Sequence, residues 1–340
     1  MNSYERVMSR LQGKTVDRVP NFDIIMGFGA HYVGATLSEY LLDHRIMVKS
    51  NLAMVSDFEI DILQTLTDPF RESVDFGLEV EFPEDGHPKR IRPLLSPGDD
   101  IKKVPLIEPG SGRRMSDRIE AVSMLHKQAN KEVPVMGWVE GAMAEANDLL
   151  SDSIMMTTLY DAPEWLTALM ERITEVEIAF ARIQIDAGAD IIGLGDAIAS
   201  IVSPAMYRKF ALPYEKQIFQ AVHEKGALAR LHICGNTSRI LPDMLESGAD
   251  LIDVDWMVDY AKAADVFGQR AGLVGNFDPV SIMNRGNEQT VEQAVLKCLA
   301  VGGDRSFSAA GCEIPDGTPQ ANLQTHARVL REAGAATSEK

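Results

Sequence analysis

Two side chains that can bind a metal ion stand at the end of one apolar run. In the segment 228–240, LARLHICGNTSRI, His232 and Cys234 are two positions apart and a glycine follows. Side chains at i and i+2 of a strand point to the same face, so an imidazole and a thiol are presented side by side where the strand ends. The pairing predicts either part of a metal site or a buried core, because free cysteine is among the most buried residue types.

A second cysteine ends another apolar run, since Cys312 closes the segment RSFSAAGC at 305–312. If both runs end at the same edge of a sheet, His232, Cys234 and Cys312 converge. Zinc binds cysteine sulfur and histidine nitrogen, and a catalytic zinc keeps one of its four positions open, so the trio predicts one catalytic zinc ion. The third cysteine, Cys298, lies on the apolar face of a helical segment, and we interpret it as a core residue.

Four carboxylates also follow apolar runs, and each has two interpretations. Glu140 and Asp196 are candidates for a catalytic or substrate-binding role in the pocket, with capping of the next helix as the alternative. Of these four, Asp255 is the nearest in sequence to the His-x-Cys strand, and we rank it as a candidate fourth zinc ligand. For Asp278, which precedes a proline, we expect helix capping.

The elements that position these residues alternate between strand and helix from residue 130 onward. Near-continuous apolar runs of this length are typical of parallel strands buried on both faces, and the alternation indicates βα units. AGAD, SGAD and VGGD, at 187–190, 247–250 and 301–304, repeat the glycine that stops a helix before the next strand. The expected strands are 133–140, 189–196, 227–234, 249–255, 271–277 and 305–312; the expected helices include 163–186, 204–225, 237–247, 288–301 and 318–334.

The N-terminal part supplies two further units, which completes an eightfold pattern. Strands are expected at 18–28 and 59–65, helices near 38–56 and at 116–130 with Ser116 as its cap, and a β-hairpin insertion at 77–94. We therefore predict one domain over residues 1–340, an α/β fold of the (β/α)8 TIM-barrel type. A helical N-terminal extension (1–18) and a frayed tail (335–340) complete it. In such barrels the active site lies at the C-terminal ends of the strands.

Composition excludes some classes of partner. The 340 residues carry a net charge of −17, which argues against nucleic acid and against an anionic membrane surface. No stretch has the length of a membrane span and the start has no signal-peptide core. Three cysteines are too few for a disulfide framework, so a cytoplasmic location with reduced thiols is expected.

The chain resembles the uroporphyrinogen decarboxylase superfamily, and within it the corrinoid-linked methyltransferase branch. The resemblance covers residues 4–334; its most specific part is the pair HICGN and GCEIPDG, beside ERVMSRLQGKTVDRVPNF at the start. It implies a TIM barrel in which His232, Cys234 and Cys312 hold zinc. It also implies methyl transfer to or from a cobalamin carried by a separate corrinoid protein, and a homodimer. The other substrate would be a small methyl donor, of the methoxy or methylamine type, or a thiol acceptor.

Two rival functions remain. Decarboxylases of this superfamily carry an arginine-rich segment that binds porphyrinogen carboxylates, whereas this chain has IMGFGAHYVG there, without arginine. The first rival is such a decarboxylase, and the second is a non-catalytic barrel stabilised by zinc that binds a corrinoid protein. The sequence has no DxHxxG segment for cobalamin, which is why we expect the corrinoid on a partner.

Overall fold

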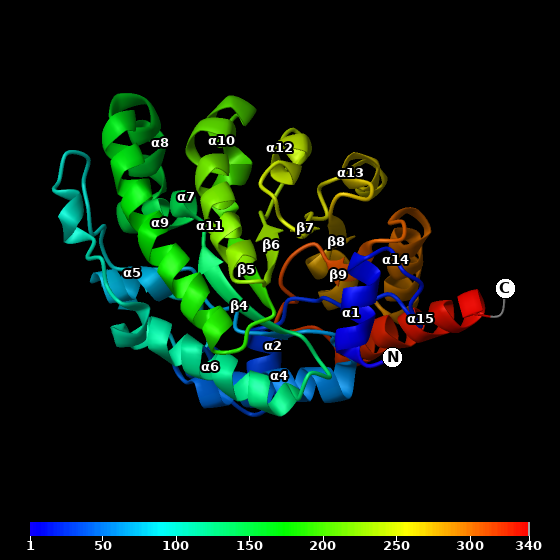
Figure 1. Ribbon diagram of the computed structural model, residues 1–340. Helices are drawn as coiled ribbons and strands as arrows, with labels where there is room; N and C mark the ends of the chain where they lie inside the picture. Colours follow the sequence, from blue (N-terminus) through cyan, green and yellow to red (C-terminus); the bar gives the residue numbers. More distant parts are fainter. Residues whose placement is uncertain (339–340) are drawn as a thin grey trace.

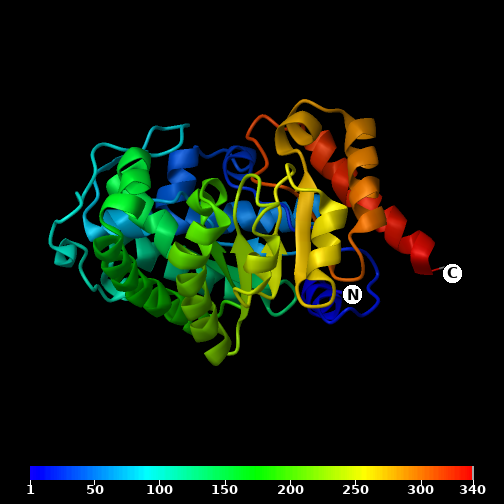
Figure 2. The same ribbon diagram turned by 90° about the horizontal axis from the view of Figure 1, so that it is seen from above.

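The computed structural model describes residues 1–338, and its centre is a parallel β-sheet surrounded by helices (Figures 1 and 2). Among these residues seven strands pair in the order β1, β4, β5, β6, β7, β8, β9, and each pair is parallel. The strands are β1 (Leu63–Gln64), β4 (Val135–Glu140), β5 (Ile191–Gly195), β6 (Leu228–His232), β7 (Leu251–Asp253), β8 (Gly272–Phe277) and β9 (Ser306–Ala310).

The sheet closes into a barrel through an irregular eighth segment near Asn21. Asn21 forms a parallel bridge with Ser308 of β9, and the Phe22 N–H donates to the Ser308 carbonyl at 2.8 Å. On the other side, the Asp61 N–H donates to the Asn21 carbonyl at 2.9 Å, just before β1. The expected TIM-barrel fold is confirmed, with the strand predicted at 18–28 reduced to this bridge.

A buried polar network fastens the same seam. Ser308 Oγ lies 2.8 Å from His326 Nε2, and His326 Nδ1 lies 2.8 Å from Asp23 Oδ2. The other oxygen of Asp23 accepts the Ala310 N–H at 2.8 Å. All three side chains are essentially inaccessible to solvent, so this Ser–His–Asp arrangement joins the first segment, β9 and the last helix rather than facing a substrate.

The strands form because their residues are apolar on both faces. Every residue of β4, β5, β7, β8 and β9 is buried, as expected of parallel strands enclosed by helices. The helices outside them are α1 (Ser3–Leu11), α2 (Gly27–Tyr32), α3 (Leu37–Leu42), α4 (His44–Phe58), α5 (Arg71–Phe76), α6 (Arg113–Ala129), α7 (Ala142–Leu150), α8 (Asp152–Asp161), α9 (Pro163–Asp186), α10 (Pro204–Phe210), α11 (Leu212–Glu224), α12 (Leu241–Leu245), α13 (Tyr260–Phe267), α14 (Glu288–Val301) and α15 (Gln320–Ser338). Short 3-10 turns η1 (Ile101–Lys103), η2 (Pro109–Ser111) and η3 (Ala197–Ile201), and the π-type turn η4 (Pro279–Asn284), complete the connections.

Two expected helices are interrupted or shortened by proline. The helix predicted at 204–225 divides into α10 and α11, because Pro213 has no N–H to continue the hydrogen bonds of α10. The helix predicted at 237–247 is reduced to α12, where Pro242 stands in the first turn. The helix expected near 38–56 divides at Asp43, whose carboxylate accepts the Arg45 N–H and caps α4.

The assignment of Ser116 as a helix cap was wrong. Helix α6 begins earlier, at Arg113, and the carboxylate of Asp75 accepts the N–H groups of Arg113, Arg114 and Met115. The Ser116 hydroxyl donates instead to the Arg113 carbonyl at 3.2 Å. The cap therefore comes from another helix, α5, and local sequence could not show it.

The decorations of the barrel lie largely where the sequence places them. Strands β2 (Val80–Glu81) and β3 (Lys89–Arg90) pair antiparallel and form the expected hairpin. Helix α15 continues to Ser338, and residues 339–340 lie outside the described residues, so the fraying of 335–340 stays a prediction. Within residues 1–338 no helix has the length and apolarity that crossing a membrane requires.

Candidate metal centre and its pocket

Three potential metal ligands meet at the C-terminal end of the barrel. His232 is the last residue of β6, Cys234 follows two positions later, and Cys312 follows β9. His232 Nε2 lies 3.0 Å from Cys234 Sγ and 3.9 Å from Cys312 Sγ, and the two sulfur atoms are 3.5 Å apart. Both cysteines are free thiols, so the sulfurs approach without a disulfide.

The spacing of these three atoms suits a tetrahedral zinc ion. Ideal zinc bonds of about 2.3 Å to sulfur and about 2.0 Å to nitrogen put two sulfurs about 3.8 Å apart and a sulfur and a nitrogen about 3.5 Å apart. The separations found here, 3.0 to 3.9 Å, bracket those values. His232, Cys234 and Cys312 could therefore hold one zinc ion with side-chain movements of a few tenths of an ångström and leave a fourth position open.

A buried ion pair orients the histidine. Asp253, at the end of β7, accepts from Arg230 Nε at 2.9 Å and from Arg230 Nη2 at 2.9 Å, and its Oδ2 lies 2.7 Å from His232 Nδ1. Because the carboxylate accepts a hydrogen bond from the Nδ1–H group, Nε2 is free to face the sulfurs. Burial alone would raise the pKa of Asp253, but Arg230 and His232 together lower it. The carboxylate thus stays ionised at neutral pH.

The two thiols differ in acidity. The pKa of Cys312 falls to about 4, chiefly because the Cys234 thiol donates to its sulfur, which outweighs the effect of burial. The hydrogen bond to Cys312, together with burial, raises the pKa of Cys234. At neutral pH without metal, the pair therefore shares one negative charge beside His232. A metal cation that binds both sulfurs would displace the remaining thiol proton.

Asp255 supports the loops that carry the two cysteines. Its Oδ2 accepts the Gly235 N–H and its Oδ1 accepts the Trp256 N–H, both at 2.6 Å. It is not one of the three residues whose ligand atoms lie within 4.8 Å of one another. Gly311 packs so tightly against this loop that an added Cβ would lie 2.4 Å from the Trp256 nitrogen. Asp255 and Gly311 therefore fix the separation of Cys234 and Cys312, and a ligand role for Asp255 stays a prediction.

The centre opens into a cavity of about 490 Å³ with mainly apolar walls. Glu140, at the end of β4, lines this cavity; its Oε1 accepts the Trp138 indole N–H at 3.1 Å and lies 3.6 Å from Arg71 Nη2. Burial raises the pKa of Glu140 well above its usual range despite Arg71. Burial likewise raises the pKa of Glu313, beside Cys312, to about 8. The apolar wall includes Ile24, Met26, Leu37, Leu41, Leu66 and Trp138.

Asp196 does not line this cavity, although it follows β5 as the sequence indicated. Its side chain is fully buried behind Gly141, where an added Cβ would meet Asp196 Oδ2 at 2.5 Å. Burial raises the pKa of Asp196 to about 7. The structure therefore brings Glu140 to the pocket with His232, Cys234 and Cys312 and leaves Asp196 beneath the surface; a catalytic role for either remains a prediction.

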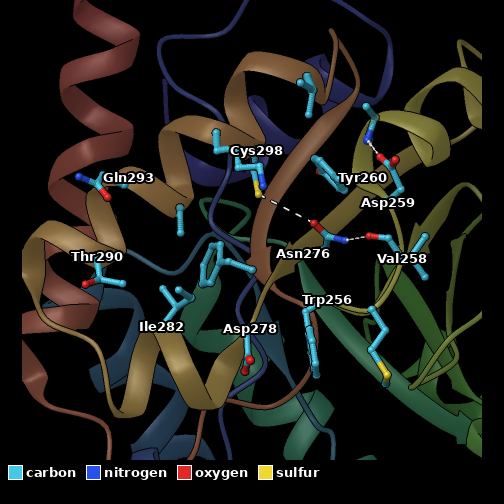
Figure 3. A pocket seen from close by; sticks show the side chains of 16 residues that line it. Trp256, Val258, Asp259, Tyr260, Asn276, Asp278, Ile282, Thr290, Gln293 and Cys298 are labelled. Atoms are coloured by element: carbon cyan, nitrogen blue, oxygen red, sulfur yellow. Dashed lines mark hydrogen bonds between the residues drawn. The ribbon is translucent and has the colours of Figure 1, made fainter.

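A second and larger hollow, about 770 Å³, lies beside the centre between α13 and α14 (Figure 3). Trp256, half exposed, stands at its border next to Asp255, and Asn276 donates to the carbonyls of Asp255 and Val258. Cys298 is buried on α14, 3.9 Å from Asn276 Oδ1, which confirms its interpretation as a core residue (Figure 3). Asp278 caps η4 through the N–H groups of Val280 and Ser281, as expected.

Residues 2–333 match the protein family described as "Uroporphyrinogen decarboxylase (URO-D)". The chain belongs to this family. It is 33% identical over 239 residues to the methylcobamide:CoM methyltransferase MtbA of Methanosarcina acetivorans, a match that covers 70% of this chain and 69% of the relative. It is 30% identical over 272 residues to the uroporphyrinogen decarboxylase of Chlorobaculum tepidum, covering 76% of each.

Among solved structures, a methyltransferase from Methanosarcina mazei superposes with a TM-score of 0.90 at 25% identity, over 98% of this chain and 99% of that one. These comparisons confirm the family and the methyltransferase branch that the sequence resembles.

Sequence reasoning missed two residues of the centre, Arg230 and Asp253. A signal was present for Arg230, because a charged residue inside the apolar run LARLH stands two positions before His232 and therefore on the same face. Asp253 precedes the chosen Asp255 by the same spacing. Which of the two carboxylates would face the histidine depends on the register of β7 against β6, which pairs Asp253 with His232.

Proposed function

We propose that this chain is a zinc-dependent methyltransferase that moves a methyl group between a small substrate and a cobamide carried by a separate corrinoid protein. The observation that carries the proposal is the convergence of His232, Cys234 and Cys312 at the floor of a cavity. Relatives named for transfer between methylcobamide and CoM favour the direction from cobamide to a small thiol.

The chain's own residues would hold the ion and one substrate. His232 Nε2 and the sulfurs of Cys234 and Cys312 would supply three ligands, and all three residues line the cavity that a substrate would enter. When bound there, zinc keeps a coordinated thiol deprotonated near neutral pH. The Arg230–Asp253 pair keeps the imidazole in one orientation while the substrate enters.

The transfer that we propose is a single displacement. The thiolate sulfur of the substrate attacks the methyl carbon, a new sulfur–carbon bond forms, and the cobalt–carbon bond breaks with its electron pair left on cobalt as Co(I). The thiol's proton leaves to solvent when the thiolate forms. The apolar wall of the cavity excludes water from the approach path, which strengthens the charge interactions within it.

The cavity argues against the decarboxylase rival. Its lining, among the described residues, includes Asp68, Glu140 and Glu313 but no lysine or arginine. A porphyrinogen with several carboxylates needs cationic partners, and these carboxyl groups would repel it unless they were protonated.

The experiment is a spectroscopic assay of demethylation. Purified protein loaded with zinc is mixed with methylcobalamin and a panel of small thiols, and loss of the methylcobalamin spectrum is followed. We expect at least one thiol to support turnover that Cys312→Ala abolishes and Cys298→Ala retains. Decarboxylation of uroporphyrinogen in the absence of any thiol-dependent reaction would contradict the proposal.

Chelation tests the second rival, a zinc-stabilised barrel without catalysis. If removing zinc unfolds the chain, the ion is structural; if helix content survives and turnover stops, the ion is catalytic. The corrinoid-binding partner and the homodimer remain predictions, to be checked by gel filtration with and without a corrinoid protein.

A further inference from the structure

A second group of potential ligands lies away from the cysteines. Glu72 of α5, Glu145 of α7 and Glu177 of α9 are all fully buried, and one carboxylate oxygen from each lies within 4.8 Å of the others. Helices α5 and α7 pack together, as do α7 and α9 (Figure 1). The three carboxylates therefore meet between these helices.

The protein does not supply enough donors for these oxygens. Glu72 Oε1 accepts from Arg71 at 2.6 Å, and Glu145 Oε1 accepts from the Ser73 hydroxyl at 2.5 Å. Within residues 1–338, no hydrogen-bond donor reaches Glu72 Oε2, Glu145 Oε2 or either oxygen of Glu177. A buried polar atom without a partner is rare in folded proteins, so four in one place indicate a missing positive group.

The charges do not balance either. Arg71 is the guanidinium beside the group, and it also lies 3.6 Å from Glu140. If the three glutamates and Glu140 were all ionised, Arg71 alone would leave an excess of three negative charges in a buried space. Burial and the neighbouring carboxylates raise the pKa values of Glu145 and Glu177 well above the usual range. A bound cation would remove that penalty.

We propose that Glu72, Glu145 and Glu177 form a binding site for one hard divalent cation, of the class of Ca²⁺, Mn²⁺ or Mg²⁺. Carboxylate oxygens are the preferred ligands of these ions, whereas zinc prefers the thiolate site. Three atoms no more than 4.8 Å apart share a point about 2.8 Å or less from each, close to the roughly 2.3–2.6 Å of calcium–oxygen bonds. Glu177 supplies two free oxygens, which suits a bidentate ligand.

The site would couple to the candidate metal centre through Arg71. Arg71 contacts both Glu72 of the cluster and Glu140 of the cavity wall. A cation bound to the three glutamates would join helices α5, α7 and α9, and Arg71 connects this cluster to the cavity wall. The ion would thereby stabilise the packing of these helices.

The test measures metal content and stability, neither of which requires the methyl-transfer activity. Protein purified in metal-scrubbed buffer is analysed for magnesium, calcium, manganese and zinc, and its unfolding midpoint is followed with and without 1 mM Mn²⁺ or Ca²⁺. The same measurements on Cys312→Ala remove metal bound at the thiol site from the count. We expect about one equivalent of a hard cation. The unfolding midpoint should rise by about 4 °C or more when the free metal concentration is about a hundred times its dissociation constant.

The matched pair of variants is Glu177→Gln and Glu215→Gln. Glu215, on the neighbouring helix α11, is also fully buried, but it accepts from the Tyr207 hydroxyl and does not belong to the three-glutamate group, so its amide variant should keep the ion. Glu177→Gln should lose the ion and the midpoint shift. If Glu177→Gln does not fold, refolding wild type with and without Mn²⁺ decides. No hard cation in wild type and no midpoint shift in millimolar metal would overturn the proposal in favour of shared protons.

Discussion

Asp253→Asn should show how much the orientation of His232 contributes to zinc binding, because it leaves the three proposed zinc ligands in place. Asp253 contacts no metal in this account; it accepts two hydrogen bonds from Arg230 and faces His232 Nδ1 at 2.7 Å. The amide keeps the shape of the side chain but loses the charge and offers an NH₂ group to two donors. Arg230, with no exposed surface, would then lack its anionic partner.

The magnitude follows from that burial. Removing one partner of a buried ion pair costs about 3–5 kcal/mol, because the remaining charge is left without compensation. Loss of the carboxylate behind a metal-bound histidine typically lowers metal affinity by about 10–100-fold. Because its pKa is lowered in the folded state, the carboxyl's contribution is present above about pH 4 and is lost as the pH falls further. The stabilities of wild type and variant should therefore converge in acid.

The assays are urea unfolding of the metal-free proteins and zinc competition against a chromophoric chelator. Asp250→Asn is the matched control, since Asp250 also faces a histidine, His223, at 2.8 Å, but this pair is partly exposed. That variant should lose about 1 kcal/mol and keep its zinc affinity. Equal zinc affinity of Asp253→Asn and Asp250→Asn would refute the role assigned to Asp253.

Three further predictions concern single residues. Cys312→Ala should abolish stoichiometric zinc while circular dichroism shows unchanged helix content, whereas Cys298→Ala should retain zinc; retained zinc in the first variant would refute ligation. Asp196→Asn should stabilise the protein by at most about 4 kcal/mol at pH 8, and this gain should vanish toward pH 4. The reason is that the raised pKa of Asp196 makes wild type lose stability as the pH rises toward 7. Urea unfolding from pH 4 to 8 measures the difference, and a pH-independent difference would contradict this prediction. Gly311→Ala should displace the Cys312 loop and lower zinc affinity about tenfold or more, while Gly317→Ala, whose Cβ meets only a side chain at 3.4 Å, should bind zinc normally in the same chelator assay.

The barrel could be predicted from the sequence because its strands are short apolar runs, each separated by a longer amphipathic segment. Two exceptions arise from tertiary contacts between segments that are separated in the sequence. The first strand is held by a single bridge at Asn21, and α6 is capped by Asp75 from a distant helix. Neither contact has a signature within the segment concerned. The breaks at Pro213 and Pro242, in contrast, have a signal in the sequence, because proline cannot donate a helical hydrogen bond.

The convergence of His232, Cys234 and Cys312 could be predicted because both strand ends were recognisable in the sequence. The carboxylates were harder, since Asp253, Asp255 and Asp196 all follow apolar runs and only strand register and backbone direction decide which one faces the centre. The glutamate cluster was beyond reach, because Glu72 and Glu177 lie on separate helices more than a hundred residues apart. Their convergence is a property of helix packing.

The central claim is that His232, Cys234 and Cys312 bind one zinc ion, and zinc X-ray absorption of the purified protein tests it most directly. We predict a first shell with two sulfurs at about 2.3 Å, one imidazole nitrogen at about 2.0 Å and one lighter, exchangeable ligand. A shell of oxygen and nitrogen alone, in protein with near-stoichiometric zinc, would contradict the account.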